Sequence, residues 1–291
     1  MSENQVAVKP QREITDSVLA KVNKLQENKA LVLPQNYVAG NALQSAALIL
    51  AETVDSSKKP VLETCSKESI ANALLDMVKM GLEPSKKQCY FVAYGGKLQL
   101  MTSYFGKLAI AKRVSDLEDV KAFVIYDGDE FETEFDLDTL SMKIKTYKPN
   151  VKNVDLTKIT GAFAVPIFKD GSKGDVVYLS IGQIKNSWNQ GYAKGNSGAH
   201  KNFTDEMCKK TIITRVCKML INSSDDGDLV DTYQGSEEET TPREAQKSMT
   251  ASKDFEEVIE TTATEVVDEP NQEASNEPVQ QTLNDDSCPI Q

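Results

Sequence analysis

Histidine, tryptophan and paired cysteines are scarce in this chain of 291 residues. His200 is the only histidine, which excludes sites that need two imidazoles, such as the zinc motif HExxH. The five cysteines are odd in number and form no CxxC pair, so a disulfide framework or a zinc site is not favoured and a reducing compartment fits. A Ser–His–Asp triad would have to use His200, which lies in a Gly/Asn/Ser-rich loop, and is not favoured either.

Long apolar runs and nucleotide-binding loops are missing as well. No stretch approaches the roughly 18 uninterrupted apolar residues of a membrane span. Residues 1–12 are polar and lack the apolar core of a secretory signal, so a cytoplasmic protein without membrane contact is expected. The pair Gly95-Gly96 is not followed by GK[ST], and nothing in the sequence signals ATP or a nicotinamide cofactor.

Positive charge is lacking overall, since the net charge is −11, but the deficit is confined to one end. Residues 225–291 contain 19 acidic and three basic residues, whereas residues 1–224 carry a net charge of +5. A segment so acidic and so poor in bulky apolar residues cannot bury enough surface to offset its ordering entropy. We expect a flexible N-terminus over 1–12, a mildly basic folded body over 13–224 and an acidic disordered tail over 225–291.

The hydrophobic period changes along the body from helical to strand-like and back. Ser66 caps one helix and Gly81 ends it, and Gly95-Gly96 indicates a tight hairpin. Strict alternation over 131–138 predicts a half-buried strand with an acidic, solvated face. The fold class is α+β, with a mostly antiparallel sheet flanked by helices. Helices are expected at 13–29, 41–54, 67–80, 104–113, 181–188 and 204–220, and strands at 88–94, 97–102, 120–126, 131–138, 142–147, 159–168 and 176–181.

A first basic cluster lies where the strand 97–102 feeds a helix through Ser103. A helix start offers free backbone N–H groups and a positive dipole end, which suit a phosphate. Tyr104 and Phe105 offer flat faces to bases. The alternative is that these aromatics belong to the core and the lysines form a solvated rim. The cationic residues of this cluster are Lys97, Lys107, Lys112 and Arg113.

A second basic cluster lies on the last helix, where Lys210 and Arg215 fall on the polar face. Lys209 instead lies within the apolar stripe of that helix, and a buried ammonium group is costly without an anion. It therefore extends to solvent, pairs with Asp205 or Glu206, or meets a phosphate; the sequence leaves all three open.

These clusters together resemble the RecT family of phage and prophage single-strand DNA annealing proteins, over about Ile70 to Leu220. The departures from the family pattern are Ser103 for a glycine, Phe105 for a basic residue that Lys107 follows, Cys208 for an alanine, and Arg215 one place after the usual arginine. The segments that match are Gly81-Leu82-Glu83-Pro84, Gln99, Tyr104, Gly106, Arg113, Gly128-Asp129-Glu130-Phe131, Met207 and Lys209-Lys210-Thr211.

The resemblance implies a protein that binds single-stranded DNA and anneals complementary strands in phage-type recombination without ATP. It implies no enzymatic activity and no cofactor, with Mg²⁺ as an optional stimulant. The implied partners are further copies of the chain in a ring or helical filament, a phage-type exonuclease and the single-strand binding protein of a bacterial host. The expected DNA-binding residues are Lys97, Gln99, Ser103, Tyr104, Lys107, Arg113, Lys209, Lys210 and Arg215.

Three other classes of protein remain as alternatives. The first is a passive protein that coats single-stranded nucleic acid without annealing it. The second is a metal-dependent nuclease using the acidic residues 127–138, although alternation spreads these along an exposed strand face. The third is a purely structural assembly protein. The acidic tail competes with DNA for the basic groove, docks a partner, or only solubilises the chain.

Overall fold

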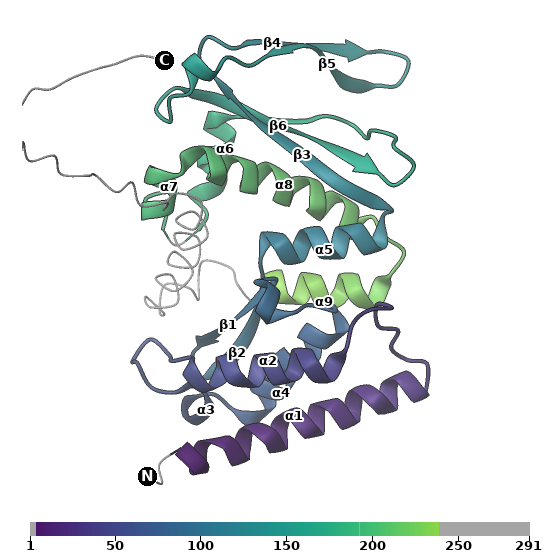
Figure 1. Ribbon diagram of the computed structural model, residues 1–291, viewed down its shortest axis with the longest axis vertical. Helices are drawn as coiled ribbons and strands as arrows, with labels where there is room; N and C mark the ends of the chain where they lie inside the picture. Colours follow the sequence, from purple (N-terminus) through teal and green to yellow (C-terminus); the bar gives the residue numbers. More distant parts are fainter. Residues whose placement is uncertain (1–3, 192, 239–291) are drawn as a thin grey trace, which may run out of the picture.

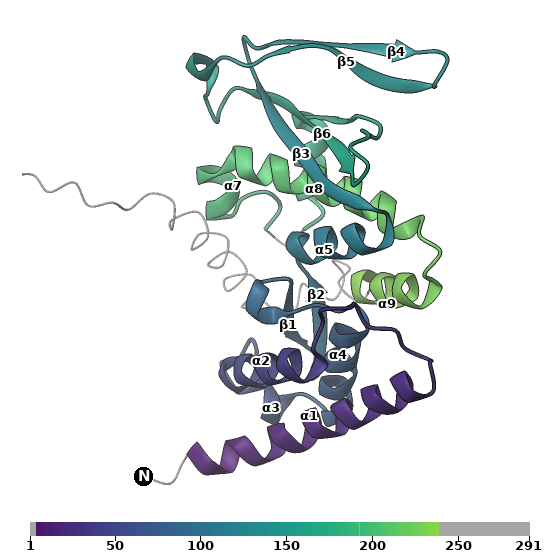
Figure 2. The same cartoon turned by 45° about the vertical axis from the view of Figure 1, so that its right-hand side comes forward.

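A computed structural model describes residues 4–191 and 193–238 (Figure 1). The strands of this part form three antiparallel sheets, with helices before, between and after them, which confirms the α+β class. Among the described helices, none combines the length and hydropathy that crossing a bilayer would require. Figures 1 and 2 both place α1 at one end of the molecule and the β4–β5 hairpin at the other.

The end that holds α1 is a helical layer against a two-stranded sheet. It contains α1 (Asn4–Glu27), α2 (Ala39–Glu52), α3 (Val61–Thr64), α4 (Lys67–Lys79), β1 (Cys89–Tyr94) and β2 (Lys97–Thr102). As expected, the Ser66 hydroxyl accepts a hydrogen bond from the Ser69 amide and caps α4. The helix ends at Gly81, whose φ of 57° is left-handed, and the Leu82 amide donates to the Met77 carbonyl.

The middle of the molecule is built from α5 (Tyr104–Val114) and α8 (Thr204–Asn222), which pack against each other. The opposite side of α8 covers the sheet formed by β3 (Leu117–Tyr126), β6 (Ile159–Phe168) and β7 (Val177–Ser180). Ser180 and Gln183 form a capping box at the start of α6 (Ile181–Trp188), the helix expected at 181–188. One continuous core therefore joins the helical layer, α5, α8 and the three-stranded sheet.

The alternation over 131–138 predicted a half-buried strand, but the strand found there is mostly exposed. It forms β4 (Glu130–Asp136), which among the described strands pairs with β5 (Ser141–Lys148) alone, in a hairpin; Phe135 and Leu137 near the tip of this hairpin are 60% and 78% exposed. Ion pairs across the hairpin, such as Glu130 with Lys148, use the acidic residues that gave the strand its pattern. Alternation reports two different faces, but it does not say whether anything covers the apolar one.

Three boundaries also differ from the expectation. Helix α1 begins at Asn4, within the stretch expected to be flexible. The sequence did not predict this first part of the helix, because a polar stretch with Pro10 carries no amphipathic signal. The Gly-rich loop contains α7 (Gly198–Asn202). The sequence suggests Thr204 as the cap of α8, but the Thr204 hydroxyl donates to the His200 carbonyl and the N-cap position is Phe203.

The third difference is at the start of the acidic tail. Helix α9 (Gly227–Glu238) lies in the segment expected to be disordered and packs against β2 and α4. Only two of its apolar residues, Leu229 and Tyr233, are buried, which is too few for a compositional argument to detect. The rest of the predicted disordered tail, 239–291, falls outside the described residues.

Candidate nucleic-acid interface

The first turn of α5 is fixed to the chain that precedes β1. The Ser103 hydroxyl donates to the Lys87 carbonyl at 2.7 Å and accepts from the Gly106 amide at 3.1 Å, so Ser103 is the N-cap of α5. The Ser103 amide donates to the Gln88 carbonyl at 3.0 Å. These bonds hold the next turn, which carries Tyr104 and Lys107, in a fixed place.

Two lysines from distant parts of the chain meet where α5 packs on α8. Lys107 is only 8% exposed. The burial of Lys210 itself, and then the charge of Lys107, lower the pKa of Lys210 to about 8. The sequence placed Lys210 on the solvated face of its helix, but Lys210 is partly buried where α8 packs on α5, whereas Arg215 of the same face is exposed. Neighbouring ammonium groups in a poorly solvated place concentrate positive potential, which is what an anion requires.

Two aromatic residues, Tyr104 and Phe105, precede Lys107 in the first turn of α5. The rings of Tyr104 and Phe105 have centroids 4.0 Å apart, and Phe105 is 37% exposed. Burial and then the nearby carboxylate of Glu206 raise the pKa of Tyr104 to about 12, so its hydroxyl stays neutral and able to donate. A flat ring with a polar edge beside cations matches the faces and phosphates of single-stranded nucleic acid.

A second group of rings holds the start of α8. The indole Nε1 of Trp188 donates to the Thr211 hydroxyl at 2.7 Å, and the indole meets the His200 ring edge-on at 4.7 Å. His200 Nδ1 lies 2.7 Å from the Ser197 hydroxyl. Burial and the charge of Lys210 lower the pKa of His200, so the imidazole is neutral. Among the described residues, the His200 ring contacts Ser197 and Trp188, so it positions the loop before α8, and neither partner supplies the carboxylate of a Ser–His–Asp triad.

Two expected DNA-binding residues lie away from the lysine pair. Lys97 is exposed at the far end of β2, six residues from Ser103 and therefore about 20 Å from it. Arg113 is at the C-terminal end of α5, where its guanidinium donates to the Met80 carbonyl at the end of α4 and to the Ala109 carbonyl. Burial lowers the pKa of Arg113. The structure thus gives Arg113 a clear role in joining two helices.

The remaining expected residues are spread around α8 and β2. Lys209 pairs with Glu206 at 2.6 Å, the pairing that the sequence had left open, and its side chain is 37% exposed. Arg215 is exposed on a later turn, about 140° around the helix from Lys210. Gln99 is 9% exposed, and its buried carboxamide oxygen finds no hydrogen-bond partner among the described residues. Ser103, Tyr104, Lys107 and Lys210 are the expected residues that the fold gathers.

The acidic residues expected by the nuclease alternative are spread rather than clustered. Asp129 accepts from the amides of Tyr126 and Asn150, and Asp136 pairs with Lys143. No group of three or more His, Cys, Asp or Glu residues is arranged to hold a metal within residues 4–191 and 193–238.

Comparison with known proteins now adds to this geometry. The model of the RecT family matches residues 40–251, well over half of the chain. The chain belongs to the RecT family. It is also similar to Protein RecT of Escherichia coli (strain K12), with 28% identity over 207 residues that cover 67% of this chain and 71% of that protein. The matched range includes α5, α8 and α9, and so contains the lysine pair of this RecT family member.

Sequence reasoning found the parts of this interface but missed how they combine. The meeting of Lys107 with Lys210 depends on how α5 packs on α8, which no local pattern encodes. From the sequence alone, Trp188 and Tyr192 fit base stacking or a structural role equally well; the bond of Trp188 to Thr211 is structural. Tyr192 lies outside the described residues.

Replacing Arg113 with methionine is expected to lower the melting temperature by several degrees without weakening the binding of single-stranded DNA by the folded protein. The loss of stability follows because the Met80 carbonyl at the end of α4 loses its charged donor, at a cost of about 1.5–3 kcal/mol. Thermal unfolding and oligonucleotide binding at a temperature below the transition measure the two effects. A large loss of affinity in a fully folded variant would instead place Arg113 at the DNA.

The affinity for single-stranded DNA is expected to fall as the pH rises above about 8. Lys210 has a pKa lowered to about 8, so above that pH the free protein must take up a proton to present an ammonium group to a phosphate. Linkage then gives a loss approaching tenfold per pH unit between about pH 8 and 10. Oligonucleotide binding at constant ionic strength checks this, and a profile that is equally steep in Lys210→Gln would contradict it.

The stability of the folded chain should depend on pH in the opposite sense. Because the pKa of Lys210 is lower in the folded than in the unfolded chain, the folded state binds fewer protons above pH 8. The contribution of Lys210 to stability therefore rises as the pH rises from about 8 towards the ordinary value of lysine.

Proposed function

We propose that this RecT family protein binds single-stranded DNA at the α5–α8 lysine pair and anneals complementary strands during homologous recombination, without ATP. The observation that carries the proposal is the packing of α5 on α8, which brings the charge of Lys107 to bear on Lys210, with Tyr104 in the same first turn of α5. Membership of the RecT family supports the same function.

The mechanism uses binding alone. Lys107 and Lys210 attract backbone phosphates, and contacts to phosphate carry no sequence information, as recombination between arbitrary sequences requires. Tyr104 and Phe105 supply ring faces beside the phosphates, so that bases stack without being identified. The free energy of annealing comes from base pairing, and the protein contributes by holding a strand with its base edges accessible.

Assembly extends this local site along a strand. We infer that several copies act together as a ring or helical filament in the bacterial cytoplasm, since one lysine pair contacts few phosphates and repetition gives cooperative binding. A nuclease that produces single strands and the host single-strand binding protein are the partners that such a reaction requires. Mg²⁺ would assist by screening the two approaching DNA strands rather than by occupying a protein site.

Strand annealing between two complementary oligonucleotides, labelled for fluorescence energy transfer and mixed without ATP, tests the proposal. We expect the full chain to accelerate pairing over the rate without protein. Binding at increasing salt should give a log–log slope of about −0.7 for each phosphate neutralised. Binding without acceleration would favour the passive coating protein, and a folded sample that neither binds nor accelerates at low salt would refute the proposed function. Degradation of labelled DNA in the presence of Mg²⁺ would favour the nuclease.

A further inference from the structure

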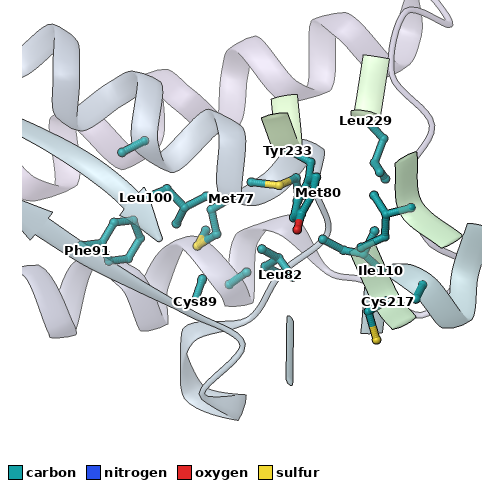
Figure 3. Close-up of a cluster of buried hydrophobic side chains, with 14 of the residues drawn as sticks. Met77, Met80, Leu82, Cys89, Phe91, Leu100, Ile110, Cys217, Leu229 and Tyr233 are labelled. Atoms are coloured by element: carbon teal, nitrogen blue, oxygen red, sulfur yellow. The ribbon is translucent and has the colours of Figure 1, made fainter. Parts of the chain in front are cut away.

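Helix α9 follows α8 after a connection of only four residues, Ser223 to Asp226. The Asp226 carboxylate accepts a hydrogen bond from the Leu229 amide at 3.1 Å, so the helix has its own capping residue. Leu229 and Tyr233, one turn apart, are 9% and 1% exposed. Figure 3 shows both side chains in the buried cluster that contains Met80, Ile110 and Cys217. Helix α9 is therefore anchored to the core by one narrow edge.

That edge lies directly at the lysine pair. The Tyr233 ring is centred 6.0 Å from Lys107 Nζ, a distance at which the ring face attracts the ammonium group. Lys107 is only 8% exposed with Tyr233 beside it. At the start of α9, the charge of Asp226 acts on Arg113 of the same α5 helix. The helix thus brings an aromatic face and a carboxylate to the cations of α5.

The rest of α9 has the composition of a ligand for a basic surface. Asp225, Asp226 and Asp231 are exposed, and the segment 225–291 has 19 acidic and three basic residues. A phosphate cannot approach Lys107 Nζ from the side that Tyr233 occupies. DNA and α9 therefore present the same two features, negative charge and a flat ring, to one lysine.

We propose that α9 is a latch on the DNA interface: docked, it occupies Lys107 through Tyr233, and its release opens the α5–α8 lysine pair to single-stranded DNA. The proposal rests on the proposed function, because it concerns access to the same site. The apparent dissociation constant of such a protein is the intrinsic constant divided by the fraction of molecules with the latch released. Weakening the latch therefore strengthens binding, which is the opposite of what loss of a binding residue does.

The variant Leu229→Ala tests the latch without touching the lysine pair. It removes one of the two buried anchors of α9 and leaves Tyr233, Lys107 and Lys210 in the chain. We expect the full-length variant to bind a single-stranded oligonucleotide at least threefold more tightly than the unaltered chain. Gln234→Ala is the matched control, since Gln234 is an exposed neutral residue of the same helix, and its affinity should not change.

Equal or weaker binding by Leu229→Ala, in a sample whose thermal transition shows that the body is folded, would overturn the latch. If the unaltered chain also fails to bind, the proposed function is refuted instead. Amide hydrogen exchange in the unaltered chain gives a second measurement that does not depend on any variant. We expect the amides of α9 to exchange faster when the oligonucleotide is bound, and slower or unchanged exchange would overturn the latch.

Discussion

The variant Lys210→Gln is expected to bind single-stranded DNA about ten- to a hundredfold more weakly than the unaltered chain, while its melting temperature stays the same or rises. A hydrogen bond to a charged group is worth about 1.5–3 kcal/mol, and each 1.4 kcal/mol is tenfold in affinity. The stability should not fall, because burial and Lys107 already disfavour the charged form of Lys210. Fluorescence anisotropy and thermal unfolding measure the two properties.

A matched control separates this effect from a general loss of positive charge. Lys173 is exposed in the loop between β6 and β7 and belongs to neither α5 nor α8, so Lys173→Gln makes the same change in net charge at another position. It should weaken binding by less than threefold. The salt dependence gives a further check, since removing one phosphate contact should reduce the log–log slope by about 0.7. Equal losses in both variants would mean that Lys210 acts only through net charge.

The opposite directions of the two effects identify the role of Lys210. A lysine that merely supports the fold loses stability and binding together when it is replaced. A lysine that is held charged in an unfavourable place for the sake of a ligand loses only the binding. The pH dependence expected for Lys210 has the same cause, since burial and Lys107 disfavour its charged form. The variant and the pH profile therefore test the same electrostatic cost by independent measurements.

Local signals in the sequence were sufficient for the elements that present the interface. The cap at Ser66, the start of a helix directly after Ser103, the exit at Gly81 and the hairpin turn at Gly95-Gly96 are all found as expected. Each of these depends on hydrogen bonds or backbone angles within a few residues, which is the range that a sequence pattern encodes. The expected α5 and the strand β6 accordingly agree with the structure to within one residue.

The partners of individual cations could not be predicted in the same way. Lys97 and Arg113 belong to the same sequence cluster as Lys107, yet one lies at the far end of β2 and the other closes α4. A cluster in sequence becomes a cluster in space only where the connecting element is short or folds back. Helix α9 could not be predicted for a related reason. The burial of its two anchoring residues, Leu229 and Tyr233, depends on the distant residues that they pack against, and a sequence pattern does not give these.

The variant Gly106→Ala is expected to lower the stability of the fold by about 1–3 kcal/mol, and to weaken DNA binding in the molecules that remain folded. A Cβ atom at this position would overlap the carbonyl oxygen of Gln88 and lie 2.9 Å from Thr102 Cγ2. Alanine favours a helix by about 1 kcal/mol over glycine, but overpacking against backbone costs about 1–3 kcal/mol even after some relaxation. The carbonyl of Gln88 is also held by the Ser103 amide at 3.0 Å, so the clash has little room to relax.

The effect on binding follows from where α5 would move. Relieving the clash means shifting the first turn of α5 relative to residues 87 and 88, which displaces Tyr104 and Lys107 from their places where α5 packs on α8. Gly40→Ala is the matched control, since Gly40 is in α2, has nothing within 4 Å of its added Cβ atom, and should gain stability from the better helix former. Thermal unfolding and oligonucleotide binding of both variants are the measurements. A Gly106→Ala protein as stable as the unaltered chain would mean that α5 is free to move against β1, and that the lysine pair is not held in place by Gly106.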